Sequence, residues 1–125
     1  MQSESLLFRQ VHPNFLLEKN ALSSEAFVPS EKDEGELSTY DGDLISASQS
    51  FVHYTQVLGW SSIGVWGISN AEVSKTGLTS RPKPLPESPA HAVVDFGQDS
   101  KGKCRRLAKI LRDFAEKRGC LYFPD

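Results

Sequence analysis

The sequence predicts an α+β fold: a single domain over residues 1–125, with a mixed β-sheet of about five to six strands and two main helices packed on it. Three observations support this prediction. A chain of 125 residues is long enough to bury one hydrophobic core. Short apolar runs bounded by Pro, Gly and Asp alternate with two amphipathic segments. The expected order is β-β-β-α-β-β-α-β, and its final strand–helix–strand unit implies a parallel pair.

Three strands are expected in the N-terminal third. Leu6–Val11 is an apolar run that is closed by a proline two residues later. Ala26–Val28 is a short apolar run, cut by the proline that follows it. Leu37–Tyr40 precedes Asp41-Gly42-Asp43, which is a turn signal. The acidic stretch 31–36 before this third strand is expected to be a solvated loop.

The first helix is expected from about Ser46 to Leu58. Ser46 and Gln49 have the spacing of a capping box, and Gly59 follows the last helical residue. The helix has a one-sided apolar face, made by Ala47, Phe51, Tyr54, Val57 and Leu58.

Two more strands are expected in the middle of the chain. Ile63–Ile68 is apolar on both sides, which is typical of a central strand. A short helical turn follows, capped by Asn70 and extending through Val73. Residues 81–89 hold four prolines and form an extended connector. His91–Phe96 is the fifth expected strand.

The last helix is expected from about Ser100 to Arg118. Its apolar positions give the clearest helical period in the chain: Cys104, Leu107, Ala108, Leu111, Phe114 and Ala115. Gly119 ends this helix, and Cys120–Phe123 is the final expected strand. The two cysteines are expected to be buried free thiols, with a disulfide or a reactive pair as the alternative.

Charge is distributed unevenly along the chain, although the net charge is only −2. Residues 1–58 hold three cations against nine acids, a net charge of −6, whereas residues 59–125 hold eleven cations against seven acids, a net charge of +4. This polarisation favours a charged partner or self-association. No apolar run approaches the roughly 20 residues that span a bilayer, and residues 1–4 lack the cationic start of a secretory signal. We therefore expect no membrane partner and a cytoplasmic location, and the oligomeric state is open.

The start of the last helix is the candidate anion-binding site. Residues 96–106 join a strand end to a helix N-terminus through a glycine-containing loop, a layout that binds phosphates in α/β folds. The helix dipole is already positive there, yet four cations crowd the first turns: Lys101, Lys103, Arg105 and Arg106. Lys109 follows on the exposed side of the helix, and these five residues are the predicted anion-binding set. Two alternatives remain. Asp99 caps the free amides without a ligand, or ion pairs to Asp113 and Glu116 neutralise the basic face.

A second set of candidate residues includes Arg9 and the histidines. A cation on an apolar strand either lies at an exposed edge or is held beside a carboxylate or a ligand, and Arg9 is such a cation. His12, His53 and His91 lie on three separate predicted elements. Two imidazoles and a lysine can cleave phosphodiesters without a metal, although each histidine also fits a structural role. The chain has no metal-ligand spacing, so we expect no metal and no cofactor.

Several stretches share a pattern with known sequences. They are Leu7–Pro13, Ser24–Asp33, Leu37–Asp43, and the His91-Ala92-Val93 strand with a basic helix that ends in Arg118-Gly119. In these stretches the chain resembles a group of small bacterial proteins of no established activity. The resemblance implies a bacterial origin and one shared fold, and no functional residue is transferred by it.

Two functions from different classes follow. The first is a small binding or regulatory module that recognises an anionic partner, either an acidic protein surface or a nucleic acid, through the basic start of the last helix. The alternative is a small enzyme acting on a phosphate-bearing substrate such as a nucleotide. In that enzyme Arg9 and Lys101 would hold the anion, and His12 or His91 would move the proton.

Overall fold

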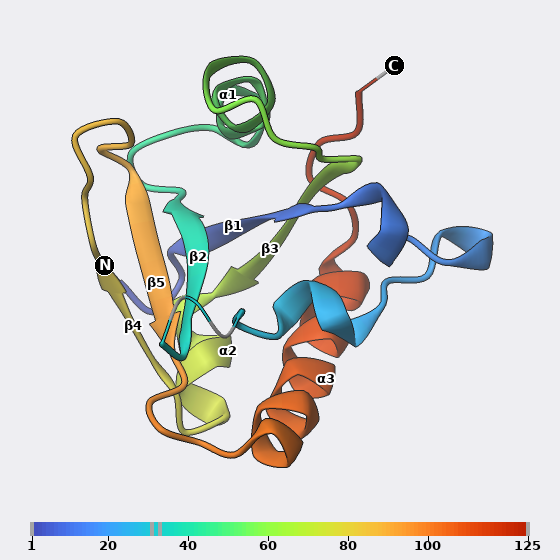
Figure 1. Cartoon of the computed structure of the whole chain (residues 1–125), viewed down its shortest axis with the longest axis vertical. Coiled ribbons are helices and arrows are strands. Elements are labelled where there is room, and N and C mark those ends of the chain that lie inside the picture. Colours follow the sequence, from blue (N-terminus) through green and yellow to red (C-terminus); the bar gives the residue numbers. More distant parts are fainter. Residues whose placement is uncertain (1, 31, 33, 125) are drawn as a thin grey trace.

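Five strands form one open antiparallel sheet in the order β3-β1-β2-β5-β4 (Figure 1). The strands are β1 (Leu6–Val11), β2 (Glu36–Asp41), β3 (Gly64–Ser69), β4 (Thr79–Pro82) and β5 (His91–Asp95). The computed structural model describes residues 2–30, 32 and 34–124. The remaining positions, which include Glu31 and Asp33 of the predicted acidic loop, lie outside the described residues. The predicted fold class, a single α+β domain, is confirmed.

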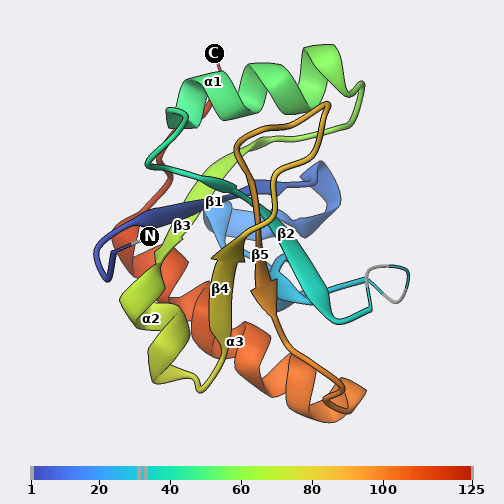
Figure 2. The same cartoon turned by 90° about the vertical axis from the view of Figure 1, so that its left-hand side faces the viewer.

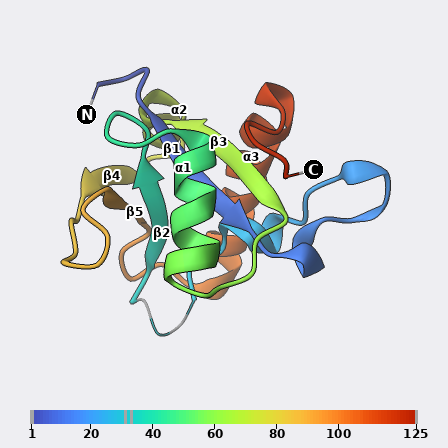
Figure 3. The same ribbon diagram turned by 90° about the horizontal axis from the view of Figure 1, so that it is seen from above.

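Helices cover both faces of the sheet (Figures 1 and 2). On one face lie α3 (Lys101–Arg118), α2 (Asn70–Lys75) and the 3-10 helix η3 (Ser24–Phe27). The other face carries α1 (Ala47–Val52), which continues as a π-helical segment, His53–Val57. Figure 3 looks onto α1, which lies over β1 and contacts β1 and β3.

The sheet therefore separates two hydrophobic clusters. Alternate residues of β1 contribute to each, because Leu7 and Val11 are buried on the α3 side and Phe8 on the α1 side. The apolar period of α3 is confirmed: Cys104, Leu107, Ala108, Leu111 and Ala115 are buried in the α3-side cluster, and Phe114 packs against it partly buried.

Side-chain caps begin the helices close to where the sequence predicts. The Ser46 hydroxyl accepts from the Gln49 amide at 3.1 Å, and Gln49 Oε1 accepts from the Ser46 amide at 3.0 Å, so the capping box is confirmed. The Ser100 hydroxyl caps α3 by accepting from the Lys103 amide at 3.2 Å. In α2 the cap is Ser69, one residue before the predicted one, because its hydroxyl and the Glu72 carboxylate complete a second capping box.

Three predicted strands differ from the structure. Ala26 and Phe27 are buried in η3 instead of pairing in the sheet. The C-terminal segment contributes one antiparallel bridge, between Tyr122 and Val65, so the sheet is antiparallel throughout instead of mixed. The third difference is β3, which is an edge strand and not a central one. All its residues are nevertheless buried, because helices cover its two faces and the segment around Tyr122 covers its outer edge.

Part of the predicted extended connector, residues 81–89, is a strand. Arg81 and Pro82, the first two residues of this connector, belong to the edge strand β4. An isolated bridge between Leu85 and Ser88 closes the turn beyond β4.

Among the described residues, no helix combines the length and the apolar character that a membrane crossing requires.

Candidate functional site

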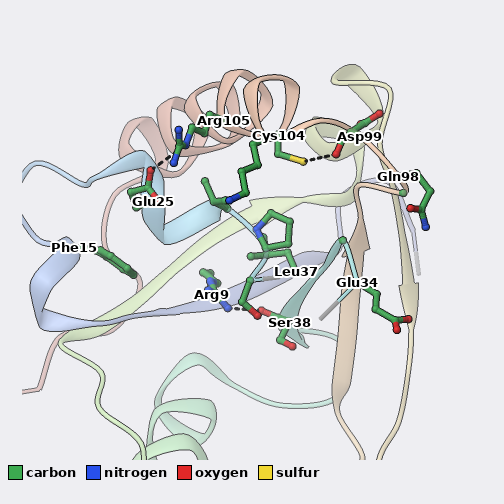
Figure 4. A pocket seen from close by; sticks show the side chains of 16 residues that line it. Arg9, Phe15, Glu25, Glu34, Leu37, Ser38, Gln98, Asp99, Cys104 and Arg105 are labelled. Atoms are coloured by element: carbon green, nitrogen blue, oxygen red, sulfur yellow. Dashed lines mark hydrogen bonds and ion pairs between the residues drawn. The ribbon is translucent and has the colours of Figure 1, made fainter. Parts of the chain in front are cut away.

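Arg9 lies on the α3-side face of β1 and is half-buried between the two apolar residues Leu7 and Val11. Its Nε donates to the carbonyl oxygen of Ala26 at 2.7 Å, and its Nη1 donates to the carbonyl oxygen of Ser38 at 2.9 Å. The guanidinium group therefore joins β1 to η3 and to β2, as Figure 4 shows for the bond to Ser38.

The divergence of β1 from β2 explains why a cation is placed there. Only Leu7–Asp41 and Phe8–Tyr40 are paired between the two strands, whereas β1 pairs with β3 along its whole length. Beyond Phe8 the two strands separate, and Figure 1 shows β1 and β3 running away from β2, β5 and β4. The Ser38 carbonyl, which would otherwise face β1, accepts from Arg9 instead.

A pocket with a volume of about 840 Å³ opens next to Arg9. It lies between the start of β2, η3 with the segment after it, and the first turns of α3 (Figure 4). Three cations line it: Arg9, Lys101 and Arg105. Three carboxylates line it as well: Glu25, Glu34 and Asp99. Phe15, Leu37 and Cys104 supply apolar surface. A pocket of this size holds a small molecule or a short stretch of chain.

The five predicted anion-binding residues are divided between the pocket and the outer surface of α3. Lys101 and Arg105 line the pocket, whereas Lys103, Arg106 and Lys109 are exposed outside it. Lys103 Nζ lies 3.2 Å from the Asp99 carboxylate, and Arg105 Nε lies 3.7 Å from the Glu25 carboxylate. Asp99 thus serves as an ion-pair partner, while the helix amide is capped by Ser100.

Ion pairs within the chain also bring the acidic and basic parts of the sequence together. Glu25 and Glu36 belong to the acidic half, and their partners Arg105, Arg81 and Lys83 belong to the basic half. The bond from Lys83 is the main reason that the pKa of Glu36 is lowered. The charge segregation of the sequence is therefore partly neutralised inside the molecule.

Farther along α3, one of the two expected intrahelical pairs is present. Arg112 lies 3.7 Å from the Glu116 carboxylate, four residues later. Asp113 was expected opposite Lys109, but it pairs at 2.7 Å with the neighbouring Arg112.

None of the three histidines lines the pocket of Arg9 and Lys101. His12 is exposed, its Nδ1 accepts from the Asn14 amide at 3.0 Å, and its ring lies edge-on to Phe15. His53 and His91 belong to the other face of the sheet, where they meet hydroxyl groups of β2. The structure brings the two proposed anion holders together and places the proposed acid/base residues elsewhere.

Two hydroxyl–imidazole pairs on the α1 side were not predicted from the sequence. His91 Nε2 lies 3.2 Å from the Ser38 hydroxyl, and its Nδ1 lies 2.8 Å from the Lys83 carbonyl. His53 Nδ1 lies 2.8 Å from the Tyr40 hydroxyl, and its Nε2 lies 2.8 Å from the Glu87 carbonyl. The carbonyls require N–H donors, so the other ring nitrogen of each histidine accepts from a hydroxyl in the neutral state. These pairs depend on strand register, for which the sequence carries no local signal.

Burial on the α1 side also affects the tyrosines. It raises the pKa of Tyr40 to about 12, and the neighbouring Tyr54 adds to the effect. Burial likewise raises the pKa of Tyr54, while the positive charge of Arg9 opposes that shift.

The two cysteines have different surroundings. Cys104 is buried as expected, its Sγ lies 3.7 Å from the Asp99 carbonyl, and burial raises the pKa of its thiol. Cys120 is exposed, contrary to the prediction, because the chain leaves α3 at Gly119 and forms no full strand there. Both thiols are free. Among residues 2–30, 32 and 34–124, no three His, Cys, Asp or Glu side chains gather in a metal-binding arrangement.

The comparisons with known proteins add no family to this description. No family model matches the chain, and no curated protein or solved structure gives a significant match. The resemblance to small bacterial proteins therefore stays a prediction.

Proposed function

We propose that this protein is a binding module that recognises an anionic partner at the pocket between β2, η3 and α3. One observation carries the proposal: Arg9 of β1 lines the same pocket as Lys101 and Arg105 of α3, although Arg9 lies almost a hundred residues before them in the sequence. Cations that converge on one concave surface attract and orient a negatively charged group.

The charges in the pocket favour an acidic segment of a protein over a nucleic acid. Glu25, Glu34 and Asp99 line the pocket together with the three cations. A uniformly charged phosphate backbone would be repelled by these carboxylates, whereas a protein segment can place neutral or donor groups opposite them. Lys103, Arg106 and Lys109 extend the basic surface outside the pocket and would attract such a segment from a distance.

Fluorescence anisotropy tests this proposal with two labelled probes, a polyglutamate peptide and an oligothymidylate. We expect the polyglutamate to bind more tightly, with its Kd rising roughly tenfold between about 50 and about 200 mM salt. Lys101→Glu and Arg105→Glu should each weaken binding about fivefold or more, as expected for the loss of about 1 kcal/mol at an exposed charge.

Lys117→Glu is the matched control, because Lys117 lies exposed in the last turn of the same helix and does not line the pocket. Affinity that ignores salt, or that falls equally in all three variants, would refute the proposal.

The enzymatic alternative is favoured in one respect, because Arg9 and Lys101 share a pocket as that mechanism requires. The pocket has no histidine to serve as its acid or base among the described lining residues. Phosphate release from a nucleoside triphosphate by the wild-type protein, abolished by Arg9→Met, would favour the enzyme over the binding module.

A further inference from the structure

We propose that the anionic partner binds as an extended strand along the edge of β2 that faces the pocket. This inference rests on the proposed function and specifies how the partner is held. Addition of a strand to an open sheet edge supplies affinity through main-chain hydrogen bonds, and side-chain contacts supply specificity.

Hydrogen-bond alternation shows which backbone groups of β2 face that edge. The Asp41 amide donates to the Ala90 carbonyl, and the Phe96 amide donates to the Gly35 carbonyl. In an antiparallel pair, every second residue exchanges these bonds with the neighbouring strand. The odd-numbered residues of β2 therefore bond to β5, and Glu36 and Ser38 direct their N–H and C=O groups to the opposite side. The bond from Arg9 to the Ser38 carbonyl is consistent with this direction.

The described part of the chain provides no strand that pairs with Glu36 and Ser38 on that side. The β1–β2 pairing ends at Phe8–Tyr40. The segment across the pocket begins with Val28, whose amide donates to the Glu25 carbonyl, and Pro29, which has no amide hydrogen. Neither residue offers an N–H group to β2, so this wall of the pocket does not complete the sheet.

The charges around the edge specify the side chains of the incoming segment. Alternate residues of a strand face opposite sides of a sheet. In a strand added to β2, one set would face the α3 side, where Arg9, Lys101 and Arg105 line the pocket. Acidic residues at every second position therefore meet the cations.

Arg9 itself would take part in the exchange. Its Nη1 occupies the Ser38 carbonyl in the free protein, and a partner N–H would take over that carbonyl. The guanidinium group would then turn to a carboxylate of the bound segment, where a charge-assisted bond is stronger than a bond to a neutral carbonyl.

The test uses the acetylated and amidated hexapeptide Val-Glu-Val-Glu-Val-Glu and the same peptide with alternate backbone amides N-methylated. The two peptides have equal charge, but the methylated one has lost half of its donors. We expect the plain peptide to bind at least tenfold more tightly. In amide exchange, the peptide should slow exchange at Glu36 and Ser38 and leave Leu37 and Thr39 unchanged, because the latter two already bond to β5.

Equal binding of the two peptides, or protection confined to other elements, overturns the strand mode. If neither hexapeptide binds while the labelled polyglutamate does, the strand mode is overturned and recognition of an anionic partner stands. If polyglutamate also fails to bind, the proposed function fails, and this inference fails with it.

Discussion

Replacement of Arg9 by methionine tests whether its guanidinium group holds the two diverging halves of the sheet together. The substitution removes the bonds to the carbonyls of Ala26 and Ser38 while retaining a long side chain. A hydrogen bond from a charged donor contributes about 1.5–3 kcal/mol. Arg9 is only half-buried, so the lower end applies to each bond, and methionine recovers part of the loss by packing against Leu7 and Val11. Two such bonds give about 3 kcal/mol before this recovery, so we expect the free energy of unfolding to fall by about 2–3 kcal/mol.

Urea unfolding followed by tryptophan fluorescence measures this change, since Trp66 is buried and stands opposite Arg9 on β3. Arg9→Lys is the informative companion, because a lysine keeps the charge but does not reproduce the forked geometry that serves two carbonyls. Its loss should be smaller than that of Arg9→Met. A methionine variant within about 0.5 kcal/mol of the wild type, the range of an ordinary surface substitution, would show that the guanidinium group does not hold the sheet halves together.

Three further predictions concern the pocket and the α1 side. Gly35→Ala should destabilise the protein by roughly 3 kcal/mol or more, because Gly35 has φ +84° and a Cβ would lie 2.3 Å from a carbonyl oxygen of the β5–α3 loop. Gly77→Ala, at φ +83° with open space around it, should lower stability by only about 1–2 kcal/mol. Equal losses of stability in Gly35→Ala and Gly77→Ala would contradict a clash at Gly35. Tyr40 keeps its proton in the folded state to a pKa of about 12, so stability should fall by about 1.4 kcal/mol per pH unit between about pH 10 and about pH 12, and in Tyr40→Phe this contribution should vanish from pH-dependent urea unfolding. An unchanged slope would contradict the assignment. Glu25→Gln should strengthen polyglutamate binding up to about fivefold in the anisotropy assay, because it removes a carboxylate that pairs with Arg105, and weaker binding would contradict this role.

Local signals accounted for most of the helices. The capping box of Ser46 and Gln49 and the apolar period of α3 each act within a few residues, so the sequence predicts them directly. Short apolar runs specify strands less directly, because the same run also fits a buried helical turn. Ala26 and Phe27 form an apolar pair that reads equally well as strand or buried helix, and contacts with α3 select the 3-10 helix.

The pocket could be predicted only in its parts. Arg9 and the cations of α3 were recognised separately, because each is unusual in its local setting. Their convergence depends on the register that ends β1–β2 pairing at Phe8–Tyr40, which is a long-range property of the sheet. The pairing of His53 with Tyr40 and of His91 with Ser38 arises in the same way.

The unequal size of the two hydrophobic clusters has a consequence for protease resistance. Among the described residues, the α1-side cluster contains four buried apolar or aromatic residues, Phe8, Tyr40, Val65 and Ala90, whereas the α3-side cluster contains eighteen. A small cluster gives less free energy to hold its helix in place. Cleavage of the native protein should therefore begin in α1 and its π-helical extension, and the layer built on α3 should outlast it.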